Sequence, residues 1–477
     1  MVFSSPVFLF LFLPIVLIVY FFLNKSAKNI FLLIASLFFY AWGEGILVLL
    51  MIFSICINYL GGLGISATKG ALKQVVLLSA VAINLAFLLY YKYLNFFLEN
   101  LQQAGFLQNL YVDPIVLPIG ISFFTFQSIS YLVDVYRGEA MVQRSPFDLG
   151  LYISLFPQLI AGPIVRYHDI DRQIQSRSHN ASLFSRGVIR FIRGFAKKMI
   201  IANPMALLAD QAFNAGGEGL PILGAWIGII CYSLQIYFDF SGYSDMAIGI
   251  GRMLGFRFLE NFQWPYISKS IQEFWRRWHI SLSSWFRDYL YIPLGGNRKG
   301  SIRTYVNLFI VFLATGFWHG AAWNFIVWGL YHGLFLIIER LGFGKRLNKL
   351  PGAISHFYLI LVVMIGWVFF RAENLSHAIT YIGYMFGIDN GENTDLYFSL
   401  SNYNVFILLV GIIFSTNLRR VIQKWVLGQI RKLQLSKRMW PKSAFEVGRV
   451  AFSFLLFIWA LAELAQNSYN PFIYFRF

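Results

Sequence analysis

Long apolar runs alternate with short polar stretches along most of the chain. Each run is close to the ~20 residues that a helix needs to cross the hydrocarbon core of a bilayer, and the alternating pattern of a membrane β-barrel is absent. The pattern predicts apolar helices over residues 7–23, 30–43, 45–64, 74–97, 114–134, 147–163, 190–212, 221–250, 304–321, 322–340, 353–371, 403–418 and 447–466. We therefore predict an all-α polytopic membrane protein with about 11 transmembrane helices plus re-entrant or interfacial ones, in a single domain over residues 1–477.

Composition supports the same fold class. The chain is 58% hydrophobic, 19% aromatic and only 13% charged, whereas a soluble domain is about half apolar and about one quarter charged. The formal net charge of +17 comes from basic residues between the apolar runs, which is typical of membrane topology and not of nucleic-acid binding. Cys56 and Cys231 both lie in apolar segments, so neither a disulfide framework nor a thiolate metal site is expected.

The positions of the basic residues predict the orientation of the chain. The first run has no basic start and no small-residue cleavage site, so it is expected to be retained. Lys25 and Lys28 follow it and place that end in the cytoplasm, which leaves the N-terminus outside. Residues 166–198, 260–303 and 419–442 are rich in Lys and Arg and are expected to be cytoplasmic. One span follows the last of them, so the C-terminus is also predicted outside.

His319 is the first candidate for chemistry, because it places an ionisable imidazole inside the apolar run 307–338. An ionisable residue at membrane depth is a functional-site hypothesis by default. The alternative is a neutral structural imidazole that bonds to a neighbouring carbonyl. Residues 117–122 combine Pro118 with Gly120, and such a break is tolerated at membrane depth where it lines protein or a wet cavity. A kinked packing helix is the alternative there.

The segment 260–303 contains an amphipathic pattern. Apolar residues recur at steps of four and three, at Ile271, Trp275, Trp278, Leu282, Trp285 and Tyr289. Polar residues occupy the other face, so one amphipathic helix is predicted, lying in the headgroup layer or beneath the bundle as a lid. His279 falls at the boundary of the two faces. Position alone favours a solvated interfacial histidine there.

Residues 235–245 bring carboxylates and hydroxyl groups into another apolar run. Asp239 and Tyr243 are one helical turn apart, so they are placed to share a hydrogen bond. A buried carboxylate must be paired or neutral. The two residues either orient a catalytic imidazole or only hold helices together. No phosphate-cradling glycine loop and no His/Cys set with metal-ligand spacing occurs in the sequence, so no metal is expected.

Several motifs together resemble the membrane-bound O-acyltransferase superfamily. They are FDFSGYSDMA (238–247), ENF (260–262), PY (265–266), FWRRWHISLS (274–283), DYLYIPLGGNR (288–298) and WHG (318–320). Residues 1–14, 117–137 and 156–166 are similar to the bacterial branch that serves alginate O-acetylation, with peptidoglycan O-acetylation and teichoic-acid D-alanylation subunits as relatives. The resemblance implies tilted helices around a central funnel, with a thioester donor entering from the cytoplasmic side and an acceptor from the other.

The resemblance also implies roles for individual residues. His319 corresponds to the family's invariant histidine and is expected to act as the general base on the attacking hydroxyl. His279 corresponds to its second polar position and is expected to orient the acceptor or stabilise the oxyanion. Asp239, Tyr243 and Asn324 are assigned supporting roles.

Four basic residues are the predicted donor site. Arg276, Arg277, Arg298 and Lys299 carry charges that attract the phosphates of acetyl-CoA or of another acetyl thioester. Positive-inside topology alone is the alternative explanation for them. No tightly bound cofactor is expected.

The C-terminal residues 470–477 form the last motif. Their aromatic pattern, Phe-x-Tyr-x-x-Phe, is similar to the C-terminal motif of the small D-alanylation carrier peptide, where the tyrosine is implied to hold the acyl group as an ester. Tyr474 is therefore a candidate acyl carrier on the extracytoplasmic side. An aromatic anchor at the bilayer interface is the alternative.

The sequence thus predicts a bacterial inner-membrane O-acetyltransferase that works in contact with membrane lipid. It is expected to pass acetyl from a cytoplasmic thioester to an extracytoplasmic polysaccharide through an esterase-like periplasmic or membrane-tethered partner. Alginate-type polymers are favoured, with peptidoglycan or another envelope polymer as the alternative. A transporter or scaffold subunit is the competing class, because broken helices and buried carboxylates also occur in carriers.

Overall fold

The computed structural model describes residues 1–215, 219–388, 400–418, 421–422, 424–426, 428–429, 440–466 and 469–471. In the first part of the chain the helices are η1 (Phe8–Phe12), α1 (Leu13–Phe22), α2 (Lys25–Glu44), η2 (Gly45–Leu47), α3 (Val48–Ala67), α4 (Gly70–Leu88), η3 (Leu89–Tyr93), α5 (Leu94–Gln103), α6 (Ile121–Arg137), α7 (Pro146–Ser154), α8 (Phe156–Leu159) and α9 (Tyr167–Gln175). Residues 104–120 connect α5 to α6 without a helix.

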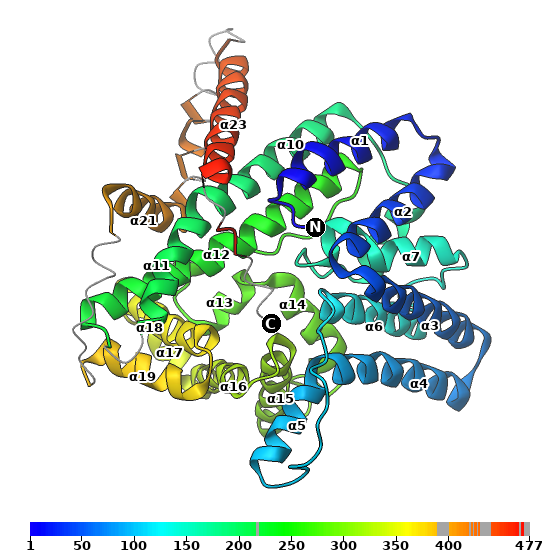
Figure 1. Cartoon of the computed structure of the whole chain (residues 1–477), viewed down its shortest axis with the longest axis horizontal. Coiled ribbons are helices and arrows are strands. Elements are labelled where there is room, and N and C mark those ends of the chain that lie inside the picture. The colour runs from blue at the N-terminus through cyan, green and yellow to red at the C-terminus, as the bar shows by residue number, and fades with distance from the viewer. Residues whose placement is uncertain are drawn as a thin grey trace.

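The second part of the chain is also helical. Its helices are α10 (Ala181–Ala196), η4 (Lys197–Ala202), α11 (Asn203–Phe213), α12 (Ile222–Met253), η6 (Pro265–Ile267), α13 (Ile271–Arg277), α14 (Ile280–Phe286), η7 (Arg287–Tyr291), α15 (Ser301–His319), α16 (Trp323–Ile338), η8 (Glu339–Phe343), α17 (Gly344–Leu347), α18 (Gly352–Arg371), α19 (Leu375–Phe386), α21 (Asn402–Phe414) and α23 (Trp440–Gln466). The longer helices surround a central region that contains α13 and α14 (Figure 1).

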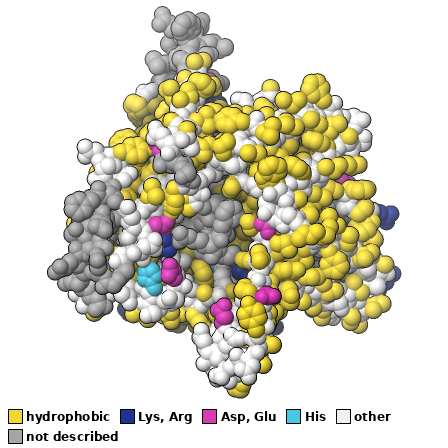
Figure 2. Space-filling view, in the orientation of Figure 1, with side chains coloured by type: hydrophobic (Ala, Val, Ile, Leu, Met, Phe, Trp, Pro, Cys, Tyr) yellow, Lys and Arg dark blue, Asp and Glu magenta, His cyan; other side chains and the backbone are white. Residues whose placement is uncertain are grey.

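The predicted fold class is confirmed, because the described residues contain seven helices long and apolar enough to cross a membrane. These are Lys25–Ala67, Gly70–Gln103, Ile222–Met253, Ser301–His319, Trp323–Leu347, Gly352–Arg371 and Glu446–Gln466. Phe8–Phe22 and Asn402–Phe414 are shorter apolar helices. Large apolar side chains such as Phe22, Ile46 and Phe357 are exposed, and yellow apolar groups cover much of the upper and right-hand parts of the molecule in Figure 2. A surface of this kind suits contact with lipid and not with water.

Other predicted spans take a different form. Residues 147–163 make two half-helices, because α7 ends at Ser154 and α8 begins at Phe156, next to Pro157. The span predicted at 114–134 becomes helical only at Ile121, after Gly120 adopts a left-handed φ of 79°. Residues 190–212 belong to the longer helical run α10, η4 and α11. The breaks agree with the presence of Pro and Gly, which end helices.

Helix α12 forms the core of the molecule and is buried along most of its length. Helix α10 packs directly against it through glycines. A Cβ added to Gly194 would lie 2.4 Å from the carbonyl oxygen of Gly242, and one added to Gly187 would lie 2.7 Å from that of Gly249. Small residues permit such close approach between membrane helices. This contact fixes the position of α12, which carries Asp239, Phe240 and Tyr243.

The prediction of one amphipathic helix over 271–289 is wrong. The chain breaks after Trp278, where His279 takes left-handed backbone angles of φ 41° and ψ 54°, and α14 starts at Ile280. The backbone carbonyl and side-chain oxygen of Asn261 accept from the N–H groups of Ile280 and Ser281. These bonds satisfy two of the donors that a helix start leaves unpaired. The aromatic face of the segment is therefore buried in the centre of the protein, with Trp278 only 3% exposed.

Candidate active site

His319 is the last residue of α15 and is buried. Three aromatic rings surround its imidazole, with centroid distances of 4.9 Å to Trp318, 4.8 Å to Trp328 and 5.1 Å to Phe370. The helix ends here because Gly320 is extended, and an added Cβ at Gly320 would lie 2.2 Å from the ring of Phe325. The tight packing fixes the histidine at the end of a rigid helix.

His279 lies close to His319 and not at the interface. Its side chain is 1% exposed, so the expectation of a solvated histidine is wrong. Its ring packs against the ring of Trp318 with a centroid distance of 6.0 Å, and Phe240 of α12 contacts its other side at 4.6 Å. His279 and His319 therefore share one tryptophan, although they are far apart in the sequence.

Asn261 sets the tautomer of His279. The backbone N–H of Ser281 donates to Oδ1 of Asn261 at 3.2 Å, which identifies that atom as the amide oxygen. The same oxygen lies 3.1 Å from Nδ1 of His279, so Nδ1 must carry the proton of the neutral ring. The lone pair of the neutral imidazole is then on Nε2, a buried atom without a hydrogen-bond partner among the described residues. In this tautomer Nε2 accepts a proton or a hydrogen bond and does not donate one.

A cavity of about 100 Å³ opens beside His319. Its wall contains Lys92, Leu117, Pro118, Ile119, Gly120, Ile121, Ser122, Phe123, Ile160, Trp318 and His319. The interrupted segment 117–122 therefore lines a cavity, as one of the two interpretations of its Pro and Gly predicted. Lys92 reaches this cavity from η3 and donates hydrogen bonds to the carbonyl oxygens of Trp318 and His319.

The predicted supporting residues lie around the site in different ways. Asp239 forms an ion pair with Lys198 at 2.8 Å, and the ring of Tyr243 stacks on Phe3 at 4.4 Å. Asn324 donates to the carbonyl oxygens of Phe369 and Ala372, and so ties the start of α16 to the end of α18. The contacts of Asn324 therefore hold two helices together. A direct role of Asp239 or Tyr243 at an imidazole stays a prediction.

The predicted donor-binding residues belong to the surface of the segment 260–303. Arg276, Arg298 and Lys299 are exposed. Arg277 is half-buried and pairs with Glu273 at 2.8 Å. Arg277 also donates to the carbonyl oxygen of Gln263, so its charge is already engaged within the protein. The donor-binding role of all four residues stays a prediction.

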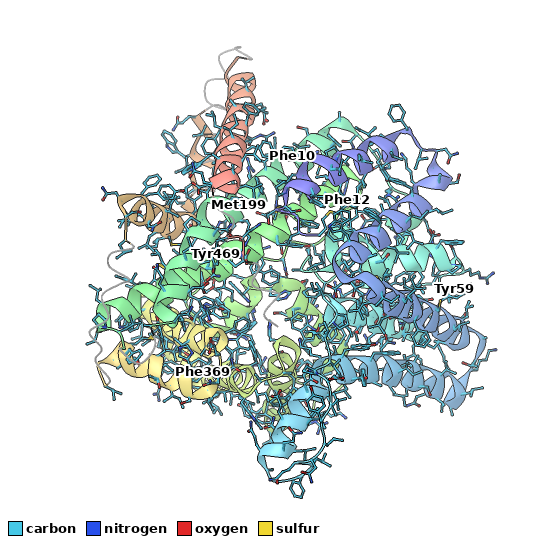
Figure 3. All side chains as sticks on the ribbon, viewed as in Figure 1. Phe10, Phe12, Tyr59, Met199, Phe369 and Tyr469 are labelled. Carbon is cyan, nitrogen blue, oxygen red and sulfur yellow. The ribbon has the colours of Figure 1, made fainter. Side chains whose placement is uncertain are left out.

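Tyr474 lies outside the described residues, whereas Tyr469, Asn470 and Pro471 are described. Tyr469 is labelled in Figure 3. Its hydroxyl donates to Asp210 of α11, which also pairs with Arg371. Asn470 donates to Ser4 at 2.9 Å. The ammonium of Lys198 donates to the carbonyl oxygen of Pro471. Residues 469–471 are therefore bound to the body of the protein, in part through charged residues of α11 and η4.

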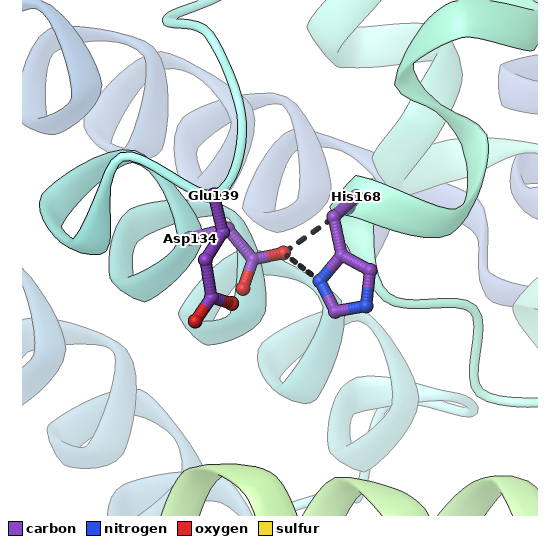
Figure 4. Close-up of side chains that lie close together, drawn as sticks. All are labelled: Asp134, Glu139 and His168. Carbon is purple, nitrogen blue, oxygen red and sulfur yellow. Dashed lines mark hydrogen bonds and ion pairs between the residues drawn. The ribbon is translucent and has the colours of Figure 1, made fainter.

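One cluster of potential metal ligands occurs among the described residues. Asp134, Glu139 and His168 offer ligand atoms within 4.8 Å of one another (Figure 4). Asp134 already accepts from the backbone N–H and Nδ1 of His168, and from the hydroxyl of Tyr289 at 2.6 Å. The hydrogen bond to Asp134 raises the pKa of His168, with partial burial opposing it. The cluster is therefore well explained as a His–carboxylate pair between α6 and α9.

Three contributors to the site were missed in the sequence: Asn261, Lys92 and Lys198. Both lysines fall inside predicted apolar spans, so the rule that singled out His319 applied to them equally. Asn261 gave no such signal, because its importance comes from the break at His279.

The fold and the site define an integral membrane protein in which two buried histidines, His279 and His319, pack on one tryptophan. A family model for the membrane-bound O-acyltransferase family matches residues 34–375. An alginate O-acetylase described as probable, from Pseudomonas putida, is 43% identical over 501 aligned residues, with all of both chains covered. Its counterpart from Pseudomonas aeruginosa is 48% identical, over 83% of this chain and 77% of its own.

A more distant relative is named for a different polymer. The peptidoglycan O-acetyltransferase of Helicobacter pylori is 38% identical over 82% of this chain and 80% of its own. This chain belongs to the membrane-bound O-acyltransferase family and is a multi-pass membrane acyltransferase.

Proposed function

We propose that this protein transfers an acetyl group from a cytoplasmic thioester, acetyl-CoA being the favoured donor, towards an extracytoplasmic polysaccharide of the alginate type. The observation that carries the proposal is the shared packing of His279 and His319 on Trp318 in the buried interior. Two imidazoles in one buried site are suited to proton transfer, and acyl transfer from a thioester to a hydroxyl needs such a transfer. The names of the alginate relatives support the choice of acetyl and of polymer.

His319 is the general base in this proposal. It takes the proton of the attacking hydroxyl while the oxygen forms a bond to the thioester carbonyl carbon. The carbon–sulfur bond then breaks, and the proton passes to the leaving thiolate, so the histidine returns to its neutral form. Each proton and electron pair is accounted for without a metal or redox partner.

His279 orients the acceptor. Asn261 holds its Nδ1–H, so its Nε2 accepts the hydrogen bond of the hydroxyl as it enters the site. The hydroxyl then turns its single proton to His319 before it attacks. This arrangement favours the first of the two roles that the resemblance implied. Stabilising an oxyanion needs a donor, and neutral His279 in this tautomer has none to offer at Nε2.

Tyr474 is the proposed first acceptor. The contacts of Tyr469 and Pro471 with Asp210 and Lys198 support this role, because they bring the C-terminal segment to the body of the protein. Tyr474 follows Pro471 by three residues, which span at most ~10 Å when extended. Arg371, the partner of Asp210, directly follows Phe370, whose ring contacts His319. A phenol ester keeps the acetyl group transferable, because phenoxide is a better leaving group than an alkoxide.

The proposal also covers the cellular location of the protein, the binding of the donor and the partner that receives the acetyl group. The protein lies in the bacterial inner membrane with both termini in the periplasm, and Arg276, Arg277, Arg298 and Lys299 attract the donor phosphates on the cytoplasmic side. An esterase-like partner takes the acetyl group from Tyr474 and passes it to the polymer. Peptidoglycan is the alternative acceptor, supported by the Helicobacter pylori relative.

The test compares His319→Gln and Tyr474→Phe with the unchanged protein in a host strain that lacks its own copy. Acetyl ester on the purified polysaccharide is measured, and the C-terminal peptide is examined by mass spectrometry for acetyl on Tyr474. Both variants are expected to lose ester while reaching the membrane in normal amounts. Ester at the unchanged level in His319→Gln would refute the enzymatic role and leave a scaffold or transporter. A C-terminal peptide without acetyl, alongside normal transfer, would refute the carrier role alone.

A further inference from the structure

A single π-helical turn reaches the end of the helix that carries His319. The turn η3 (Leu89–Tyr93) interrupts the run from α4 to α5, and π-turns within helices are frequently found at functional sites. Its Lys92 donates from Nζ to the carbonyl oxygens of Trp318 at 2.6 Å and His319 at 3.3 Å. The hydroxyl of the next residue, Tyr93, donates to the carbonyl oxygen of Phe317.

These bonds satisfy three successive carbonyl groups at the C-terminal end of α15. The last four carbonyl groups of a helix have no partner within it, and a cation near this end interacts favourably with the helix dipole. The end of α15 is therefore held by side chains from η3. The two bonds from Lys92 end on His319 itself and on the adjacent Trp318, so the position of His319 depends on them. The bond from Tyr93 ends two residues before the histidine.

The ammonium of Lys92 uses its hydrogen-bond donors within the protein. Its third bond goes to Oγ of Ser122 at 3.3 Å, near the start of α6, and an ammonium has only three donors. It is therefore unsuited to binding a substrate carboxylate or phosphate. Lys92 is nevertheless buried and lines the cavity beside His319. Burying a charge at membrane depth costs free energy. A role in positioning the histidine therefore explains the presence of Lys92 better than helix packing does.

We propose that Lys92 is a positioning residue for acyl transfer, which holds His319 at the wall of the cavity by binding the last two carbonyl groups of α15. The inference rests on the proposed role of His319 as general base. The cavity of about 100 Å³ is smaller than the ~150 Å³ that accommodates benzene in an engineered apolar cavity. It therefore has room for a group as small as acetyl, and a histidine displaced from its wall would no longer face that group.

The test uses the full chain in lipid nanodiscs, with thiol release from acetyl-CoA in the first turnover as the assay, because one acetyl group fills Tyr474 when no partner is present. The kcat and KM below are the maximal rate of that turnover and the acetyl-CoA concentration that gives half of it. Lys92→Met removes the charge and both bonds to α15 at similar side-chain length, whereas Lys92→Arg keeps a charged donor. Tyr93→Phe is the matched control, because it removes a bond to the same helix end from the same turn but does not line the cavity. His319→Gln tests the base itself. The kcat, the KM for acetyl-CoA and the thermal unfolding midpoint are measured for each.

We expect Lys92→Met to lower kcat at least ~10-fold, because displacing a catalytic group by about 1 Å can reduce a rate ~100-fold. Its KM is expected to stay within about threefold, with Lys92→Arg recovering part of kcat and Tyr93→Phe staying close to the unchanged protein. Equal losses in Lys92→Met and Tyr93→Phe that follow their unfolding midpoints would show a merely structural role and overturn the inference. An active Lys92→Met beside an inactive His319→Gln would overturn it while leaving the proposed function intact. An active His319→Gln would instead overturn the proposed function.

Discussion

The side-chain oxygen of Asn261 accepts a hydrogen bond from Nδ1 of His279 at 3.1 Å. The same oxygen accepts from the backbone N–H and the hydroxyl of Ser281, at 3.2 and 2.9 Å. One buried amide therefore fixes both the tautomer of His279 and the start of α14. Asn261 belongs to the motif ENF (260–262), which contributes to the family resemblance, but its role follows only from these contacts.

Replacing Asn261 by Ala should affect both stability and transfer. The change leaves Nδ1–H of His279 and N–H of Ser281 without their acceptor inside the protein, and an unsatisfied buried donor costs about 1–3 kcal/mol. It also frees His279 to rotate or to change tautomer, so we expect a loss of kcat of at least ~10-fold. Initial rates and thermal unfolding in detergent measure the two effects.

Ser244→Ala is the control for Asn261. The Nδ2 group of Asn261 donates to Oγ of Ser244 at 3.1 Å, so this change perturbs the same amide but leaves its bond to His279 in place. Transfer should stay within about threefold of the unchanged protein. If Ser244→Ala loses as much activity as Asn261→Ala, the hydrogen bond to His279 is not what matters.

Replacing Tyr469 by Phe should weaken the attachment of the C-terminal segment. The change removes the hydroxyl that donates to Asp210 and leaves the ion pair between Asp210 and Arg371 in place. A hydrogen bond to a charged group contributes about 1.5–3 kcal/mol. We therefore expect acetylation of the C-terminal peptide to fall about 10-fold or more, with little change in thermal stability. Quantitative mass spectrometry of that peptide is the measurement.

Tyr403→Phe provides the comparison for Tyr469→Phe. It also removes a hydrogen bond from a tyrosine to a carboxylate, that of Glu463, but between α21 and α23. It should leave acetylation of the C-terminal peptide unchanged. Equal acetylation in the two variants would argue against a role for Tyr469 in delivering the segment.

The pair of His168 and Asp134 should make stability depend on pH. The hydrogen bond to Asp134 raises the pKa of His168 above its ordinary value, although partial burial and the nearby Arg166 act against this and Asp169 adds to it. A group with a raised folded-state pKa stabilises the protein fully below its ordinary value of about 6.5. That contribution is lost as the pH rises through the raised pKa. Thermal midpoints should therefore fall with rising pH over that window.

His168→Gln isolates this effect. The variant keeps a polar side chain but cannot titrate, so the difference in midpoint between it and the unchanged protein should be largest at low pH and shrink towards high pH. Unfolding in detergent between about pH 5.5 and 9 covers the range in which a histidine titrates. A difference that is constant over the range would show that the protonation of His168 does not contribute to stability.

Much of the framework was predictable from the chain alone. Apolar run length predicts membrane helices because unsatisfied backbone groups are not tolerated in lipid, and α15, α16 and α18 lie close to their predicted positions. His319 was conspicuous for a related reason. Burying an ionisable side chain in an apolar run costs free energy, so such a residue is a functional-site hypothesis by default. Pro118 and Gly120 correctly indicated an interrupted segment.

The tertiary structure decided which of these groups meet. Lys92 and Trp318 are 226 positions apart, and Asn261 and His279 are 18 apart with a helix break between them. A periodic pattern describes only how a helix divides its own faces. The pattern at 271–289 predicted one continuous surface helix, because it contains no information about a distant hydrogen-bond acceptor. Asn261 is such an acceptor, and its bonds favour the break at His279. The sequence by itself thus determined the membrane helices and the conspicuous histidine, whereas packing between distant segments determined the second buried histidine, its tautomer and the lysine that holds the end of α15.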